Sequence, residues 1–258
     1  MSNRAALFGM MQRPALTFSN DHSGLFNGIT QSVNLGTGVS LTTGGQAKSW
    51  SGWFYPTSNI LPYQPLVDSS QVGQAGESGS LLLTAGGNFI YQLYNSTASR
   101  GLDIAYTGTA AFVLNAWNFF VISKGDNTAA NFKIYMGNGG TVSALSLTVN
   151  LNTLQAGDTI LLTPTSYGYS PANSTYFAGN MTQMAIWNRA LSSSDVTALY
   201  NAGTPTDLTG KTGLTDWYQF STALTPADQP TGTIYDRTGA NNGTTVNTTS
   251  GFLVTSVP

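Results

Sequence analysis

The chain has 258 residues, of which 41% are hydrophobic and 8% are charged, and its formal net charge is −2 at pH 7. This length and hydrophobic content are enough to bury a core, which excludes intrinsic disorder, and the nine basic residues occur singly, which argues against nucleic acid binding. The absence of cysteine excludes disulfides, thiolate metal sites and thiol nucleophiles.

The N-terminus carries an apolar run, Ala5–Met11, that is short for a signal peptide and has no small-x-small cleavage site after it. We therefore expect no signal peptide and interpret residues 1–14 as an N-terminal arm. No stretch reaches the roughly 18 apolar residues that a membrane span requires, so we expect a soluble protein without membrane insertion. Residues 15–258 are predicted to form a single domain that includes a C-terminal extension, residues 204–258.

Short runs of alternating, β-branched or aromatic residues follow one another along the chain, separated by Gly, Asn, Pro and Thr. They predict strands at 15–18, 32–35, 48–55, 65–69, 80–84, 88–94, 117–124, 131–136, 143–151, 158–162, 179–187, 214–220 and 252–256. Gly86-Gly87 and Gly139-Gly140 supply the positive φ of tight reversals. Because strands and long helices do not alternate, the fold class is predicted as all-β, an antiparallel sandwich.

A single helix is predicted near residues 192–202, after the strand that ends at Trp187. Ser192 can cap the first turn, and Asp195 stands at the third position, where a carboxylate meets free N–H groups. Gly203 suits a left-handed stop.

The stretch Tyr176–Gly203 contains Gly-Asn-Met-Thr-Gln-Met-Ala-Ile-Trp-Asn-Arg-Ala-Leu-Ser, followed by Leu-Tyr-Asn-Ala-Gly. It resembles the closing motif of laminin-G-like domains of the concanavalin A-like lectin-glucanase superfamily. Ser49–Pro56, Ala116–Val121 and Phe132–Gly139 resemble further strands of that family in the same order. The resemblance covers roughly Leu25 to Gly203, and it implies a jelly-roll sandwich.

Two departures from the family pattern bear on calcium. The acidic residue of the family's hairpin is missing around Gly137-Asn138, and Thr182 stands where the motif has Asp. Five aspartates fall at predicted turns or strand ends where oxygen ligands could gather: Asp68, Asp103, Asp126, Asp158 and Asp236. We interpret them as ordinary turn residues and predict no metal site and no cofactor.

The C-terminal segments Asp216–Phe220, Tyr235–Thr244 and Leu253–Pro258 resemble an extension that accompanies laminin-G-like domains in structural proteins of tailed phages and marine viruses. This resemblance implies a virion protein.

Catalytic residues are scarce. Glycoside hydrolysis needs two carboxylates about 5 to 10 Å apart, whereas Glu77 is the sole glutamate and its flanks predict a loop. The sole histidine, His22, lies in a polar turn. We therefore predict that the protein is not an enzyme.

Aromatic residues in polar loops are the candidate contacts, since an aromatic face can stack on the apolar face of a pyranose. The candidates are Tyr63, Tyr167, Tyr169 and Tyr176, with Asn173 between them in the loop 166–175. Tyrosine in such loops is equally typical of protein contact surfaces, so glycan and protein contact both stay open. Three tryptophans within strand patterns are predicted to belong to the core: Trp53, Trp117 and Trp187.

Two functions follow from these patterns. The first is a non-enzymatic virion structural protein, a capsid decoration or fibre-associated subunit on the virion surface, bound to the capsid or other virion proteins and forming a homo-oligomer or lattice. The charged fraction of 8%, against about 25% in ordinary domains, suits such assembly. The alternative is a free carbohydrate-binding or adhesin module at an extracellular or cell surface, and a decoration protein could also bind cell-surface glycans.

Overall fold

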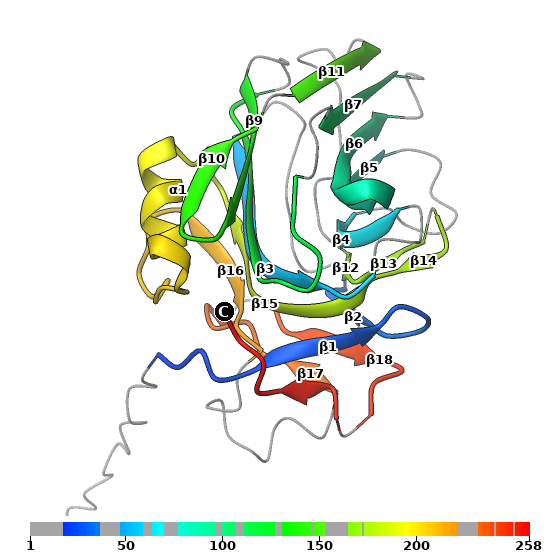
Figure 1. Ribbon diagram of the computed structural model, residues 1–258, viewed down its shortest axis with the longest axis vertical. Coiled ribbons are helices and arrows are strands. Elements are labelled where there is room, and N and C mark those ends of the chain that lie inside the picture. The colour runs from blue at the N-terminus through cyan, green and yellow to red at the C-terminus, as the bar shows by residue number, and fades with distance from the viewer. Residues whose placement is uncertain are drawn as a thin grey trace, which may run out of the picture.

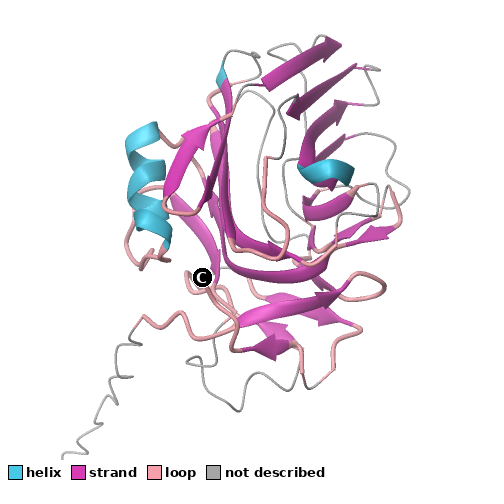
Figure 2. Ribbon diagram, in the orientation of Figure 1, coloured by secondary structure: helices cyan, strands magenta, loops and turns pink. Residues whose placement is uncertain are grey.

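The computed structural model describes residues 18–36, 47–58, 63–69, 77–95, 100–106, 111–126, 131–145, 147–152, 165–171, 173–220, 232–239, 241–249 and 251–258. Within these ranges the chain forms two antiparallel sheets that face each other, and one α-helix packs outside them (Figures 1 and 2). The predicted antiparallel sandwich with one short helix is confirmed. The predicted arm at 1–14 and the predicted strand at 158–162 lie outside the described residues.

The first sheet has eight described strands in the order β10-β9-β8-β3-β15-β1-β19, and β16 also pairs with β15. Its strands are β1 (Ser23–Asn27), β3 (Lys48–Pro56), β8 (Asn118–Lys124), β9 (Phe132–Asn138), β10 (Thr141–Ala144), β15 (Ala178–Trp187), β16 (Leu214–Tyr218) and β19 (Leu253–Val254).

The second sheet has nine described strands in the order β11-β7-β6-β5-β4-β12-β2-β18-β17. Its strands are β2 (Ser32–Asn34), β4 (Gln64–Asp68), β5 (Glu77–Thr84), β6 (Asn88–Asn95), β7 (Arg100–Tyr106), β11 (Leu147–Asn152), β12 (Ser166–Tyr167), β17 (Thr233–Ile234) and β18 (Gly243–Val246). A separate hairpin consists of β13 (Tyr169–Ser170) and β14 (Thr175–Tyr176).

The structure corrects three sequence predictions about strands. The single strand predicted at 143–151 is two strands, because the chain leaves the first sheet after β10 and enters the second as β11. Alternation alone could not reveal this crossing, because the hydrophobic period continues through it. Glu77 opens β5 instead of lying in a loop, and Phe18, the described end of the strand predicted at 15–18, is outside any strand. The predicted reversal at Gly139-Gly140 is confirmed by φ values of +59° and +98°.

The central strands of the first sheet, β3, β8 and β15, are buried on both faces, whereas antiparallel sheets commonly leave one face to solvent. Along β3, Trp50 and Phe54 join the cluster of side chains between the sheets, and Trp53 joins a second cluster on the opposite face. On that opposite face the Trp53 ring stacks on Tyr200, with the ring centroids 5.5 Å apart. The core prediction is confirmed for Trp53 and Trp187, which are almost fully buried.

The helix α1 (Ser193–Tyr200) supplies much of this outer cluster and lies against the first sheet at the left of Figure 1. Ser192 accepts a hydrogen bond from the Asp195 backbone N–H, and the Asp195 carboxylate accepts one from the Ser192 backbone N–H, which completes the capping box. The left-handed stop comes earlier than predicted, at Asn201 with φ +45°, ahead of Gly203. Among the described residues, no helix combines the length and the apolar character that crossing a membrane requires.

The Asn-Arg-Ala-Leu-Ser motif joins β15 to this helix. Both terminal nitrogens of the Arg189 guanidinium donate to the Asp195 carboxylate at 2.8 Å, and its Nε donates to the Thr212 carbonyl at 2.9 Å. These charge-assisted bonds hold the pKa of Asp195 well below its usual range. The motif is therefore a structural lock that fixes the helix on the sheet.

The C-terminal extension contributes β16 and β19 to the first sheet and β17 and β18 to the second. A turn at Asp236 connects these strands. The Asp236 carboxylate accepts hydrogen bonds from the backbone N–H groups of Trp217, Thr238 and Asn241. The Tyr218 hydroxyl donates to the Asn241 carbonyl at 2.7 Å. The extension motif thus folds into a polar turn that is bonded to β16.

Among the described residues of the interior between the sheets, the Trp50 Nε1 and the Tyr91 hydroxyl have no hydrogen-bond partner. The two rings lie 6.0 Å apart, centroid to centroid, and burial raises the pKa of Tyr91. A buried polar group without a partner costs roughly 1–3 kcal/mol of stability.

We expect Tyr91→Phe to raise the free energy of unfolding by up to about 1 kcal/mol, because it removes a buried hydroxyl that bonds to nothing. Tyr218→Phe is the matched control. It removes the same atom from a buried tyrosine whose hydroxyl is bonded, so it should lower stability by about 1–2 kcal/mol. Urea unfolding of the two variants and the parent measures both changes in stability, and equal losses in the two variants would contradict an unpaired Tyr91 hydroxyl.

Candidate functional site

The hairpin β13–β14 carries two of the tyrosines predicted as contacts. Tyr169 and Tyr176 are directly opposite each other in its register, and their rings stack with centroids 4.5 Å apart and planes inclined by 26°. Both side chains are half-buried. The hairpin lies beside β4, at the side of the molecule opposite helix α1 (Figure 1). The stacked pair therefore stands at the surface on a short, separate element.

Tyr63 reaches the same hairpin through its backbone. The Thr175 hydroxyl donates to the Tyr63 carbonyl at 2.5 Å, so a residue distant in sequence is tied to the hairpin. Tyr63 has a left-handed φ of +64°, which is rare for a bulky side chain, and it is 38% exposed. We call Tyr63, Tyr169, Asn173 and Tyr176 the tyrosine surface.

Asn173 and Ser174 form the exposed tip of the hairpin. The Asn173 amide donates to the Ser170 hydroxyl at 3.1 Å, which orients the amide toward the hairpin. Ser174 has a left-handed φ of +51°. The tip thus offers an amide and hydroxyl groups next to the stacked tyrosines.

The base of the hairpin is held by close packing. Gly168 has φ +77°, and a Cβ there would lie 2.5 Å from the Phe26 ring, so the position requires glycine. The Gly168 carbonyl accepts a hydrogen bond from the Phe177 backbone N–H at 3.0 Å. The Gln64 side chain accepts from the Ala178 backbone N–H at 3.1 Å and donates to the Ser58 carbonyl at 2.7 Å. These contacts position the hairpin against the end of β4.

Tyr167 does not belong to this surface. It is 1% exposed, pairs with Val67 in the second sheet and packs edge-on against Tyr218. The prediction placed it with the other tyrosines because loop composition cannot tell that Ser166–Tyr167 forms the strand β12. Tyr167 is therefore removed from the set of contact candidates.

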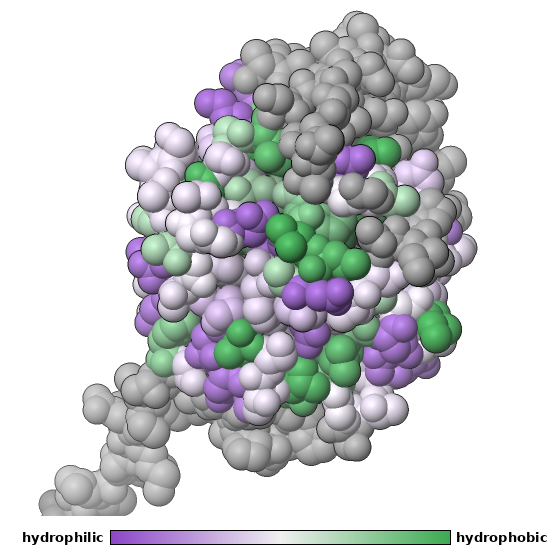
Figure 3. Space-filling model, in the orientation of Figure 1, coloured by the Kyte–Doolittle hydropathy of each residue, from purple (hydrophilic) through white to green (hydrophobic). Residues whose placement is uncertain are grey.

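Sequence reasoning missed a second aromatic pair. Tyr55 and Trp117 pack edge to face with centroids 5.7 Å apart, and both are half-buried. The sequence predicts Trp117 to be core because it falls within the predicted strand 117–124, but β8 begins at Asn118 and Trp117 lies at the margin of the outer cluster. Large exposed hydrophobic residues in the described part are Leu25, Ile29, Tyr63, Val113 and Val246, and Figure 3 shows hydrophobic residues interspersed with polar ones on one face.

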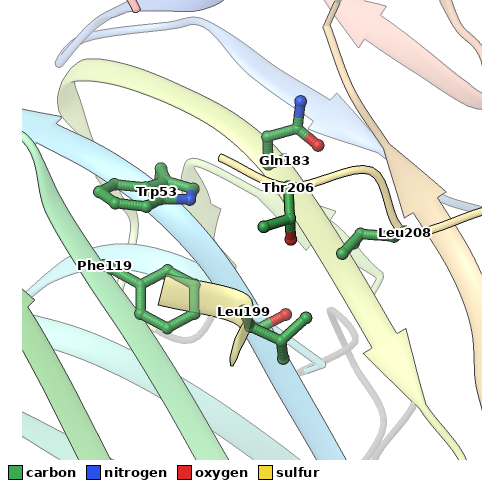
Figure 4. A pocket seen from close by; sticks show the side chains of 7 residues that line it. Trp53, Phe119, Gln183, Leu199, Thr206 and Leu208 are labelled. Atoms are coloured by element: carbon green, nitrogen blue, oxygen red, sulfur yellow. The ribbon is translucent and has the colours of Figure 1, made fainter. Parts of the chain in front are cut away.

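A small hollow lies between the outer face of the first sheet and the segment after α1 (Figure 4). Its empty volume is about 220 Å³, and its lining comprises Ser51, Trp53, Phe119, Gln183, Leu199, Thr206 and Leu208. The polar side chains of Ser51 and Gln183 already accept hydrogen bonds from the indoles of Trp187 and Trp217. The space that a water molecule could occupy is about 10 Å³, room for about one water, so we interpret this hollow as imperfect packing beneath the helix.

The two positions that depart from the family's acidic pattern have structural roles here. The Thr182 hydroxyl lies within hydrogen-bond distance of the carbonyls of His22 and Gln219, at 3.1 and 2.8 Å. A Cβ at Gly137 would lie 2.6 Å from the Tyr200 ring, so the helix takes the space of a side chain there. Among the described residues, no group of three or more histidines, aspartates and glutamates could hold a metal ion.

The aspartates that were weighed as calcium ligands have other contacts where they are described. The Asp68 carboxylate is fully buried and accepts from the Ser80 hydroxyl at 2.9 Å. Asp126 accepts from the Asn131 amide at 2.8 Å, and Asp236 holds the turn of the C-terminal extension. Asp158 lies outside the described residues, as does the side chain of Asp103.

The tyrosine surface can therefore supply aromatic faces, phenol hydroxyls and an amide, all uncharged. Burial, the neighbouring Tyr176 and the Asp68 charge raise the pKa of Tyr169, which keeps its phenol neutral. Such a set can bind by stacking and hydrogen bonding.

Solved structures with the same fold include a candidate carbohydrate binding protein from Bacteroides ovatus, with a TM-score of 0.60 and 14% identity. The match covers 91% of this chain and 60% of that structure, so the chain spans about three fifths of its length. The CBM40 module of the Ruminococcus gnavus IT-sialidase, bound to α2,3 sialyllactose, has a TM-score of 0.46 and 14% identity over 70% of this chain and 99% of that one. Tailspike protein 2 of an Escherichia coli O157:H7 bacteriophage has a TM-score of 0.38 and 12% identity over 79% of this chain and 30% of that one.

None of the curated proteins matches the chain significantly. The family model Laminin_G_3, described as the concanavalin A-like lectin/glucanases superfamily, matches residues 27–197. This match spans most of both sheets and ends within helix α1, whose cap and Arg189 lock carry the closing motif. The chain therefore belongs to the Laminin_G_3 family of the concanavalin A-like lectin/glucanases superfamily.

Proposed function

We propose that the protein is a non-catalytic domain that binds carbohydrate through the tyrosine surface. The observation that carries this proposal is the stacked pair Tyr169 and Tyr176 at the surface of an anchored hairpin, with the exposed Asn173 at its tip. Aromatic rings with a polar group at one end suit a sugar, which has apolar C–H faces and a rim of hydroxyl groups. The amide and the phenols can donate to those hydroxyls and accept from them.

The backbone of this surface supports the proposal. Tyr63 and Ser174 both adopt the left-handed conformation, which costs a residue other than glycine about 1–2 kcal/mol. Strain of this kind persists where the surrounding contacts over-determine the position, and it gathers at binding sites. The Thr175–Tyr63 hydrogen bond is one such contact.

The family relationship and the fold shared with a candidate carbohydrate binding protein from Bacteroides ovatus are consistent with this function. The residue inventory supports a role without catalysis, since Glu77 is the sole glutamate and His22 the sole histidine.

A second function, attachment to a virion as a capsid decoration or fibre-associated protein, is compatible with the first. It is supported by the charged fraction of 8%, and by the resemblance of the C-terminal extension to viral structural proteins. In this proposal the domain is held on the particle, as an oligomer or lattice, and presents the tyrosine surface to glycans of the host cell.

We expect Tyr169→Ala and Tyr176→Ala each to weaken glycan binding about five- to tenfold, since loss of one stacking contact is worth roughly 1–1.4 kcal/mol. Tyr235→Ala, which removes a half-buried tyrosine of the C-terminal extension, is the matched control and should bind as the parent does. Trp117→Ala tests the second aromatic pair. A glycan array followed by calorimetry measures these affinities, and a loss confined to Trp117→Ala would move the site to that pair.

The left-handed φ of Tyr63 predicts that two truncations of its side chain, to glycine and to alanine, differ in their effect on stability. Tyr63→Gly should be more stable than Tyr63→Ala by about 1 kcal/mol, because only glycine adopts a φ near +64° without cost. At Tyr235, which has no positive φ, the order should reverse. Thermal or urea unfolding of the four variants measures this, and the same order at both positions would contradict a strained Tyr63.

For virion attachment, we expect mass spectrometry of purified particles to detect this chain in a fixed ratio to the major capsid protein. We also expect the chain to leave the particle fraction when the capsids are disassembled and the products are fractionated. Its absence from intact particles would eliminate the second function and leave the first in place.

A further inference from the structure

We propose that the ligand of the tyrosine surface is a neutral glycan, one without carboxylate or sulfate groups; this inference rests on the proposed function and specifies its substrate class. The sequence around the surface provides the first argument. No lysine or arginine occurs between residues 49 and 99 or between residues 134 and 188, and every residue of the tyrosine surface comes from those two segments.

Sheet register shows how far away the next basic residue of the second sheet lies. Arg100 opens β7, three strands from β4, and is level with Glu77 along the ladder. Leu83, six residues further along β5, is level with Gln64, the neighbour of Tyr63. With strands about 4.8 Å apart and about 3.3 Å per residue, the backbone of Arg100 is roughly 25 Å from that of Tyr63.

The other described basic residues belong to the first sheet, to its connections with the helix or to the C-terminal extension. They are Lys48, Lys124, Lys133, Arg189, Lys211 and Arg237. Lys48 and Lys124 are almost fully buried, and Arg189 is bonded to Asp195. Arg4 and Arg13 lie outside the described residues.

The charged side chain that acts electrostatically on Tyr169 of the hairpin is the carboxylate of Asp68. Asp68 is fully buried below the hairpin, at the position in β4 that pairs with Ser166, and it contributes to the raised pKa of Tyr169. Proteins recognise carboxylate and sulfate groups through charge-assisted bonds, most often from arginine. An anionic sugar on this surface would lose hydration and meet a buried carboxylate, with no described cation to compensate.

The polar groups that are present match a neutral sugar. The Asn173 amide, the Ser174 and Thr175 hydroxyls and the phenols are neutral groups, and they pair with hydroxyls without a charge partner. Binding that lacks ion pairs should also be insensitive to salt.

The test uses the full chain and pairs of related ligands, one neutral and one anionic. Methyl-esterified homogalacturonan oligosaccharides are compared with the same oligosaccharides after de-esterification, and lactose is compared with 3′-sialyllactose. A panel of neutral gluco-, galacto- and manno-oligosaccharides broadens the search. Calorimetry is run for the parent and for Tyr176→Ala, at 20 and 500 mM NaCl.

We expect the neutral member of a pair, or a neutral member of the panel, to bind at least about tenfold more tightly than an anionic counterpart, which corresponds to about 1.4 kcal/mol. This binding should change less than about twofold with salt and should be lost in Tyr176→Ala. Equal or tighter binding of an anionic ligand that is also lost in Tyr176→Ala would overturn the neutral class and leave the proposed function standing. If no glycan of either charge depends on Tyr176, the proposed function fails, and this inference fails with it.

Discussion

The structure depends on the burial of both faces of one antiparallel sheet. On the inner face, Trp50 and Phe54 of β3 pack into the space between the sheets, and on the outer face Trp53 packs against Tyr200 of the helix. Because the side chains of one strand alternate between the two faces, a shift in strand register would displace the side chains on both faces together. The Arg189–Asp195 lock and the capping box keep the helix in place over the outer face.

This arrangement leaves the second sheet and its connections to provide the contact surface. The hairpin β13–β14 follows β12 directly and is fixed by the close approach of Gly168 to Phe26 and by the Gln64 side chain. Binding residues commonly lie on connections that a rigid scaffold positions. Here the scaffold positions a connection in which two tyrosines stack on each other, and the cost of ordering them is met during folding, before a ligand arrives.

The few charged residues of this chain serve largely structural purposes. Asp195 and Arg189 stabilise the helix start, Asp236 organises the C-terminal turn, and Asp68 is buried against Ser80. The polar character of the chain therefore rests largely on amides and hydroxyls, which also are the groups that exchange hydrogen bonds with sugars. Scarcity of charge is thus common to both proposed roles, adhesion to glycans and dense packing on a particle.

The sequence by itself determined the fold class, most strand positions and the helix start. These features follow from local rules: the two-residue period, the glycine pair 139–140, and the serine–aspartate spacing of the capping box. It also determined the family, because the closing motif is one continuous run of residues that can be read without knowing what it packs against. It also singled out the tyrosine-bearing segment 166–175 by its composition, and the structure shows this segment as the strand β12 followed by the hairpin β13–β14.

Only the tertiary structure decided which tyrosines form a surface. Tyr167 and Tyr169 are two residues apart, yet one is buried in a strand pair and the other stacks on Tyr176. The tertiary structure also decided that Tyr63, more than a hundred residues away, is tied to the same hairpin, and that the 143–151 run crosses between sheets. The physical reason is the same in each case: exposure and long-range pairing depend on which distant segment lies opposite, and local sequence carries no record of that partner.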